Sequence, residues 1–134
     1  MGSTVSAIIP TLGRSPLLVP CLEALRRDGG AALEIVVVDQ GEEPVELPNG
    51  LADRVVRPGR NLGFAGGTNA GIKAASGNLV ATVNDDVLVE PGWTAALTEA
   101  LAADPRAAAA QGVNLLLDAP DRTDGCGLAW NRWW

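Results

Sequence analysis

The sequence predicts an α/β domain built on an open, mostly parallel sheet that is flanked by helices. Apolar, strand-like runs alternate along the chain with stretches of helical periodicity, which is the pattern of parallel strands joined by right-handed crossovers. The run Ile35-Val36-Val37-Val38 is continuous and β-branched, as is typical of a strand buried on both faces. With 134 residues, 47% apolar and 19% charged, the chain can form a core and does not have the composition of a disordered protein.

The first half of the chain is expected to contain two strands, a helix and a loop. Residues 5–9 form a short apolar run, which predicts a first strand that Pro10 stops. Ser15-Pro16 offers a helix N-cap followed by a proline at the first helical position, and this helix is expected to end at Gly29-Gly30. A loop over residues 42–49, which contains two prolines, follows the second strand.

The second half continues the same alternation. A weak helical pattern that contains several glycines covers residues 64–75. A further helix is expected over residues 91–103, strands over residues 54–57 and 79–83, and a fifth strand within residues 107–117. We treat residues 1–134 as one domain.

Composition excludes several classes of chemistry. The chain contains no histidine, which removes Ser-His-Asp and Cys-His catalysis and histidine-ligated zinc. The net charge of −6 argues against nucleic acid as the main partner, because phosphate binding favours a basic face. No secretory signal or membrane-spanning run is visible, so we expect a cytoplasmic protein in which Cys21 and Cys126 are reduced thiols.

Polar or glycine-rich segments follow four predicted strands at their carboxyl ends. These segments are residues 10–14, 39–41, 60–71 and 84–86. In open α/β sheets, ligands bind outside the carboxyl ends of the strands. The convergence of four such segments therefore predicts a binding site at that edge.

Each of these segments also has a purely structural interpretation. Asp39 can be a turn former, the glycines can serve only tight turns and close packing, and Asp85-Asp86 can be a solvated turn. Placed after a buried strand, however, the Asp85-Asp86 pair also suits Mg²⁺ or Mn²⁺, which takes one or two carboxylates together with substrate phosphates. The helix that starts near Phe64 would direct its free N–H groups to the same place, so a diphosphate is the ligand that fits both features.

Four stretches resemble, in order, family 2 glycosyltransferases with the GT-A fold. They are VSAIIPTLGR (5–14), EIVVVDQG (34–41), NLGFAGGTNAGI (61–72) and VNDDVLVEPGW (83–93). The third stretch is similar to the rhamnosyl- and galactofuranosyl-transferase-like branch of bacteria. The resemblance implies inverting transfer from a UDP- or dTDP-sugar to a glycan or lipid-linked acceptor, with Mn²⁺ or Mg²⁺ as cofactor.

The resemblance also implies roles for individual residues in base recognition. Pro10 and Thr11 would border the nucleobase, with Arg14 nearby. Asp39 would accept a hydrogen bond from a ring N–H of uracil or thymine.

The remaining implied residues belong to the sugar and diphosphate part of the site. The loop over the ribose and diphosphate would contain Asn61, Gly63, Gly67 and Asn69. Asn84-Asp85-Asp86 align with the family's D-x-D motif, so that Asp86 would bind the metal and Asp85 would face the donor sugar or ribose. Asn84 departs from the motif, because its neutral amide lowers the negative charge of the site.

The acceptor-binding part and the catalytic base are expected to be missing. In the family, the base lies well downstream of D-x-D, whereas the closing segment here offers only Asp118, Asp121 and Asp124, which we expect in a surface loop. The tryptophan-rich residues 130–134 are expected to leave an apolar patch that favours a homo-oligomer. Peripheral membrane association of a full-length protein is compatible with this organisation.

Two other function classes stay open at this point. One is a nucleotide-sugar-binding module without turnover, which would share the donor and metal site. The other is a nucleotidyltransferase, which should carry a glycine- and basic-rich loop directly after the first strand. Residues 10–14 are too short and too poor in glycine for that loop.

Overall fold

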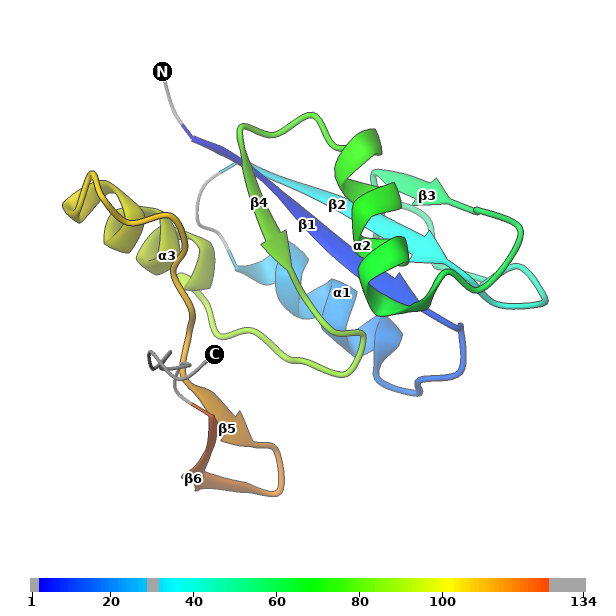
Figure 1. Cartoon of the computed structure of the whole chain (residues 1–134). Helices are drawn as coiled ribbons and strands as arrows, with labels where there is room; N and C mark the ends of the chain where they lie inside the picture. The colour runs from blue at the N-terminus through cyan, green and yellow to red at the C-terminus, as the bar shows by residue number, and fades with distance from the viewer. Residues whose placement is uncertain (1–2, 29–31, 126–134) are drawn as a thin grey trace, which may run out of the picture. The chain divides into compact units, whose positions relative to one another are not determined.

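A computed structural model describes residues 3–28 and 32–125 of the chain (Figure 1). The chain divides into two compact units, Met1–Thr94 and Ala95–Trp134, and each is described by itself.

The first unit is built on a four-stranded parallel sheet with the strand order β3-β2-β1-β4 (Figure 1). The strands are β1 (Thr4–Thr11), β2 (Ala32–Asp39), β3 (Arg54–Val56) and β4 (Leu79–Thr82). The chain adds β2 and β3 on one side of β1 and then returns to place β4 on the other side. The strand order therefore reverses between β1 and β4, and the predicted fold class is confirmed.

Two helices cover opposite faces of this sheet (Figure 1). Helix α1 (Leu18–Arg27) packs on the face to which Ile35 and Val37 point. Helix α2 (Gly63–Ala74) lies over Val36 and Val38 on the other face. Residues 35–38 of β2 are all 0% exposed, which confirms that β2 is buried on both faces.

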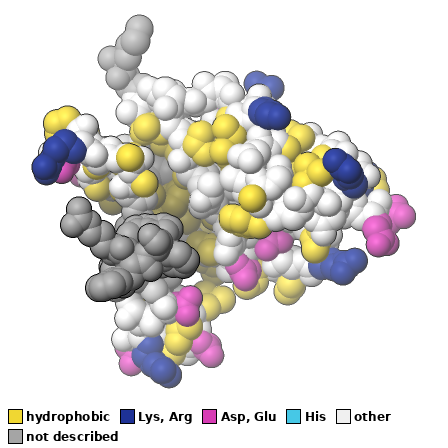
Figure 2. All heavy atoms as spheres, in the orientation of Figure 1, with side chains coloured by type: hydrophobic (Ala, Val, Ile, Leu, Met, Phe, Trp, Pro, Cys, Tyr) yellow, Lys and Arg dark blue, Asp and Glu magenta, His cyan; other side chains and the backbone are white. Residues whose placement is uncertain are grey.

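Strand β4 is one of the two edge strands, and its α2-side face is only partly covered. Val80 of β4 is 45% exposed and Ile72 of α2 is 40% exposed. The hydrophobic side chains visible in Figure 2 include a group on the face where α2 and β4 lie. Helix α2 thus covers β1 and β2 rather than the sheet edge.

Strand β1 continues through Pro10, so the expectation that this proline stops the strand was wrong. Val83 N donates to Ile8 O (3.0 Å), which shows that the backbone polar groups of Ile8 face β4. Pro10, two residues later, faces the same side, but β4 has already ended at Thr82. The missing N–H of Pro10 therefore breaks no bond of the sheet.

Helix α1 begins at Leu18, three residues after the expected cap. Ser15 Oγ accepts a hydrogen bond from Leu17 N (3.2 Å), and Ser15 O accepts one from Leu18 N (3.3 Å). Ser15 therefore forms a turn before the helix and is not its N-cap. The expected stop at Gly29-Gly30 lies outside the described residues.

The end of the first unit is held by a buried carboxylate. Asp28 is 4% exposed and accepts hydrogen bonds from both the backbone N–H and the hydroxyl of Thr94. Thr94 is the second residue of α3 (Trp93–Ala103). The carboxylate of Asp28 therefore accepts a backbone N–H of the first turn of this helix, as a helix cap does.

The second unit contains a two-stranded antiparallel hairpin, β5 (Asn114–Leu116) and β6 (Ala119–Gly125). The strand expected within residues 107–117 is therefore present at Asn114–Leu116, but it pairs with β6 and not with the four-stranded sheet. The Ala-rich start of that stretch has low strand propensity. Asp121 and Asp124 lie in β6 rather than in a loop, whereas Asp118 lies in the hairpin turn.

No helix within the described part of the chain is long and apolar enough to cross a membrane. The expected self-association through residues 130–134, and the state of Cys126, concern residues outside that part.

Candidate donor-binding site

The loops that follow β1 and β4 are joined by side-chain hydrogen bonds at the point where the strand order reverses. Thr11 Oγ1 donates to Asp85 Oδ2 (2.5 Å) and accepts from Gly13 N (2.9 Å). Ser15 Oγ donates to the backbone oxygen of Asp85 (3.3 Å). Ligands of open α/β sheets bind in the crevice at such a reversal, so this pair of loops is the centre of the candidate site.

The turn that contains Asn84 also forms a hydrogen bond with helix α1. Cys21 Sγ on α1 donates to Asn84 O (3.5 Å). Burial, followed by the nearby charge of Asp85, raises the pKa of the Cys21 thiol to about 11. The thiol is therefore protonated at neutral pH and supports the turn as a donor rather than acting as a nucleophile.

The carboxylates of Asp85 and Asp86 can hold a hard cation. Asp86 is exposed. Within the part of the chain that the structure describes, its side chain makes no hydrogen bond or ion pair, and only one oxygen of the Asp85 carboxylate has a partner. Among residues 3–28 and 32–125, no group of three or more metal-ligating side chains occurs. The donor set therefore fits Mg²⁺ or Mn²⁺ that is completed by water and phosphate oxygens, and it does not form an all-protein cage.

Gln40 fixes the start of helix α2, a role that the sequence did not reveal. Its Oε1 accepts from Leu62 N (2.8 Å), and its Nε2 donates to Gly63 O (3.3 Å). Asn61 Oδ1 accepts from Gly63 N (2.8 Å), where Gly63 has the positive φ of 72° that favours glycine. The amide oxygen of Asn61 is thus used within the loop itself.

The glycines inside α2 allow the helix to approach the sheet closely. A Cβ on Gly67 would lie 2.5 Å from Gln40 Nε2, and a Cβ on Gly71 would overlap Cγ2 of Ile8. The packing role of these glycines is therefore confirmed, whereas phosphate contact by Gly67 stays a prediction. Asn69 is exposed on the same helix, and its side chain has no hydrogen-bond partner among the residues that the structure describes.

Asp39 makes two hydrogen bonds and one ion pair within the protein, and its side chain is 0% exposed. Oδ1 accepts from Gly41 N (3.0 Å), while Oδ2 accepts from Val45 N (2.9 Å) and pairs with Arg57 Nε (3.0 Å). The turn-forming interpretation is therefore confirmed. Contact between Asp39 and a base ring stays a prediction. It requires the loop after β2 to shift so that a ring N–H of the base can reach Oδ1 of Asp39.

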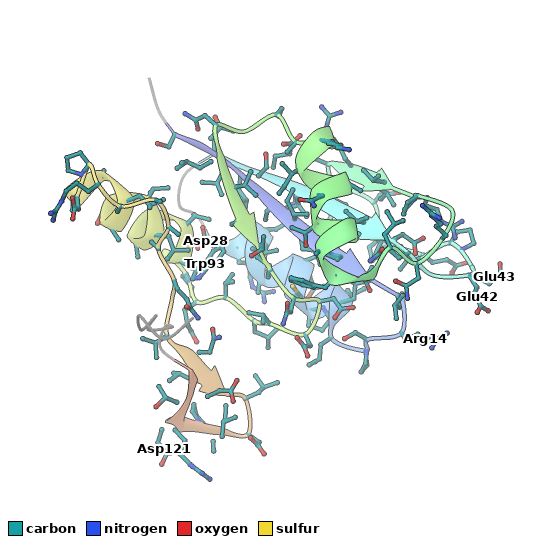
Figure 3. All side chains as sticks on the ribbon, in the orientation of Figure 1. Arg14, Asp28, Glu42, Glu43, Trp93 and Asp121 are labelled. Carbon is teal, nitrogen blue, oxygen red and sulfur yellow. The ribbon has the colours of Figure 1, made fainter. Side chains whose placement is uncertain are left out.

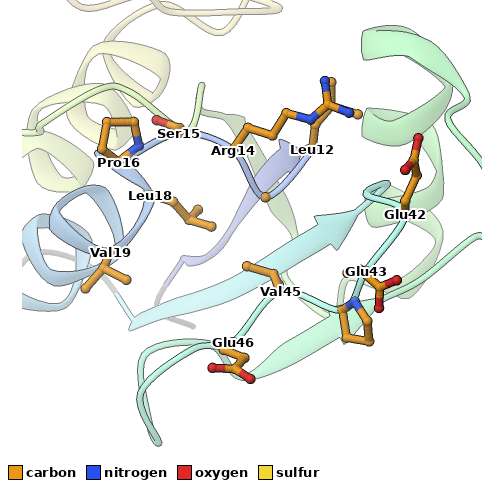
Figure 4. A pocket seen from close by; sticks show the side chains of 12 residues that line it. Leu12, Arg14, Ser15, Pro16, Leu18, Val19, Glu42, Glu43, Val45 and Glu46 are labelled. Carbon is orange, nitrogen blue, oxygen red and sulfur yellow. The ribbon is translucent and has the colours of Figure 1, made fainter.

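A cavity of about 510 Å³ lies between the loop after β1 and the loop after β2 (Figure 4). Arg14 lines one side, and Glu42, Glu43 and Glu46 line the other. Arg14, Glu42 and Glu43 lie at the same end of the sheet (Figure 3). Of the residues expected around the base, only Arg14 is part of the cavity wall. Pro10, Thr11 and Asp39 are not.

The model of the family described as glycosyl transferase family 2 matches residues 6–121. The chain belongs to glycosyl transferase family 2. Two relatives in this family come from Bacillus subtilis (strain 168). The uncharacterized glycosyltransferase YwdF is 36% identical over 92 residues, which are 66% of this chain and 34% of YwdF. The uncharacterized glycosyltransferase EpsJ is 31% identical over 101 residues, which are 71% of this chain and 29% of EpsJ.

A solved structure supports the family fold. The structure of S. aureus TarS 1–349 in complex with UDP-GlcNAc matches with a TM-score of 0.61 and 24% identity, over 74% of this chain and 30% of TarS 1–349. The chain spans about a third of the length of the curated family 2 relatives it matches. The family 2 resemblance and the GT-A fold are therefore confirmed, while the narrower branch stays a prediction.

Proposed function

We propose that this chain is the donor-binding part of a metal-dependent, inverting glycosyltransferase. Its donor is a UDP- or dTDP-sugar, and its acceptor is a glycan or a lipid-linked sugar. The observation that carries the proposal is the hydrogen bond from Thr11 to Asp85 where the strand order reverses, next to the exposed carboxylate of Asp86. This hydrogen bond connects the carboxyl end of β1 to a pair of carboxylates that can still bind a ligand.

The donor is held by groups from two sides. Asp86, assisted by Asp85, would hold Mn²⁺ or Mg²⁺, which neutralises charge on the diphosphate when bound. The N–H of Gly63 donates to Asn61, but the rest of the first turn of α2 presents backbone N–H groups that helical bonds leave free, and such N–H groups bind anions. Gln40 and Asn61 fix the path of the chain into that turn. The relative TarS, which is crystallised with UDP-GlcNAc, supports a uridine nucleotide as the donor class.

Transfer also requires a base, which we place outside residues 1–134. The acceptor oxygen attacks the anomeric carbon as the bond to the diphosphate breaks, and a carboxylate must take the acceptor proton. Asp118, Asp121 and Asp124 lie on a two-stranded hairpin that belongs to the second unit. Among the described residues, none forms a hydrogen bond that would orient the carboxylate of any of the three. We therefore expect donor binding with little or no transfer by this chain.

Calorimetric titration with UDP, dTDP and GDP, each with MnCl₂ or with EDTA, tests the donor site. UDP and dTDP should bind more tightly with Mn²⁺, and Asp86→Ala should remove that gain. Glu90→Ala, which changes an exposed carboxylate that has no recorded side-chain partner, is the control and should bind as the wild type does. GDP binding as tight as that of UDP would contradict a pyrimidine-specific site.

A binding module without turnover is the second candidate, favoured by the unoriented late carboxylates. Sugar transfer assayed with residues 1–134 separates the two functions. Efficient transfer that is lost in Asp118→Asn, Asp121→Asn or Asp124→Asn would show that the chain carries its own base.

A further inference from the structure

We propose that Thr11 is a positioning residue for Asp85, and that its hydroxyl fixes the orientation in which this carboxylate meets the nucleotide sugar. The inference rests on the proposed function, because it concerns the same donor site. It gives Thr11 a role beside the one that the family resemblance implied, which was to border the base and which stays a prediction.

The hydrogen bonds around the Thr11 hydroxyl can run in only one direction. Gly13 N donates to Thr11 Oγ1 (2.9 Å), so the oxygen already accepts one hydrogen bond. The single hydroxyl hydrogen is then donated to Asp85 Oδ2 (2.5 Å), because an ionised carboxylate only accepts. Thr11 is 3% exposed, so water does not compete for this hydroxyl.

The backbone and the side chain of the Asp85 turn are held by different groups. Ser15 Oγ donates to Asp85 O, and Cys21 Sγ donates to Asn84 O. The carboxylate of Asp85, in contrast, has Thr11 as its only hydrogen-bond partner within residues 3–28 and 32–125. Removal of the Thr11 hydroxyl is therefore expected to free this carboxylate while the turn keeps its path.

The same bond affects the charge of the carboxylate pair. Asp85 and Asp86 are adjacent and repel each other, and a donor on Oδ2 of Asp85 partly compensates that negative charge. With Oδ2 bound to Thr11, Oδ1 is left for the ligand. Thr11 thus determines which oxygen of Asp85 is available, although it does not touch the ligand itself.

A double-mutant cycle with UDP and MnCl₂ as the probe tests this role by calorimetry. Thr11→Val removes the hydroxyl at similar volume and should weaken UDP binding about tenfold, while Thr11→Ser should restore most of the affinity. Thr82→Val makes the same change at an exposed threonine of β4 whose hydroxyl has no hydrogen-bond partner among the described residues, and this variant should bind UDP as the wild type does. Thr11→Val combined with Asp85→Ala should bind no more weakly than Asp85→Ala alone. Thr11→Ala replaces Thr11→Val if the latter lowers the unfolding temperature below the assay range.

Additive losses in the double variant, or wild-type affinity in Thr11→Val, would overturn the positioning role and leave the proposed function intact. A wild-type chain that does not bind UDP with Mn²⁺ would overturn the proposed function, and the positioning role with it.

Discussion

Replacement of Glu34 by Gln should destabilise the chain in a pH-dependent way. Glu34 lies in β2 and connects three neighbouring segments of the first unit. Its carboxylate accepts hydrogen bonds from Ser6 Oγ (2.5 Å), Ser76 N (2.8 Å) and Arg54 Nε (2.9 Å). Its side chain is only 11% exposed. The carboxylate thus joins β1, β3 and the turn before β4.

The size of the effect follows from the pKa of Glu34. Hydrogen bonds from Ser6, then from the backbone of Ser76, and also from Arg54 lower this pKa from 4.5 to about 2. A shift of that size corresponds to at most roughly 3 kcal/mol of folding free energy at neutral pH. Arg54 is half exposed, so water screens its share, and we expect a loss of about 2 kcal/mol in Glu34→Gln.

The sign of the pH dependence follows from the lowered pKa. The stabilisation is fully present above pH 4.5 and is lost as the pH falls toward 2, because the carboxylate then becomes protonated in the folded state as well. Urea unfolding followed by circular dichroism at pH 7, 5 and 3 should show a difference between wild type and Glu34→Gln that falls to about half by pH 3. Glu23→Gln, which alters an exposed carboxylate with a 3.8 Å pair to Arg27, should change stability by no more than about 0.5 kcal/mol. A difference for Glu34→Gln that is the same at all three pH values would refute the reasoning.

Three other predictions concern the interior. Gly71→Ala should destabilise the chain by about 1–3 kcal/mol in urea unfolding, because the added methyl overlaps Ile8, whereas an unchanged midpoint would contradict the packing of α2 on β1. Cys21 should resist iodoacetamide at pH 7 in the native chain and react once urea unfolds it, because burial raises the pKa of its thiol to about 11; rapid native labelling would argue against that burial. Arg57→Ala should lower stability by about 1–3 kcal/mol because it removes the charge partner of the buried Asp39, and a stability equal to that of the wild type would show that Asp39 does not need this partner.

The parts of the fold that the sequence predicted are those fixed by local patterns. The β-branched run of β2 and the glycine-rich start of α2 carry enough local information to be placed. The paths of Pro10 and of residues 107–117 depended instead on where neighbouring strands end and on which strand pairs with which. Those are long-range properties that periodicity does not contain.

The same distinction holds for the candidate site. The residues at the strand ends could be predicted, because carboxyl ends of parallel strands share one edge of the sheet. Their partners could not be, since Thr11 and Asp85 are 74 positions apart in the chain, and Gln40 and Leu62 are 22 apart. The full burial of Asp39 could not be predicted either, because the two residues that contact its Oδ2 atom, Arg57 and Val45, lie in different loops.

Backbone amide shifts of the ¹⁵N-labelled chain, measured on addition of UDP with Mg²⁺, test the donor site most directly. We expect the largest changes in three segments that lie at or after the carboxyl ends of β1, β3 and β4, namely residues 11–15, 61–67 and 84–86. The amide shifts of residues 76–78, which precede β4 at the amino ends of the strands, should change little. Unchanged shifts at 84–86, or the largest changes at 76–78, would contradict the account.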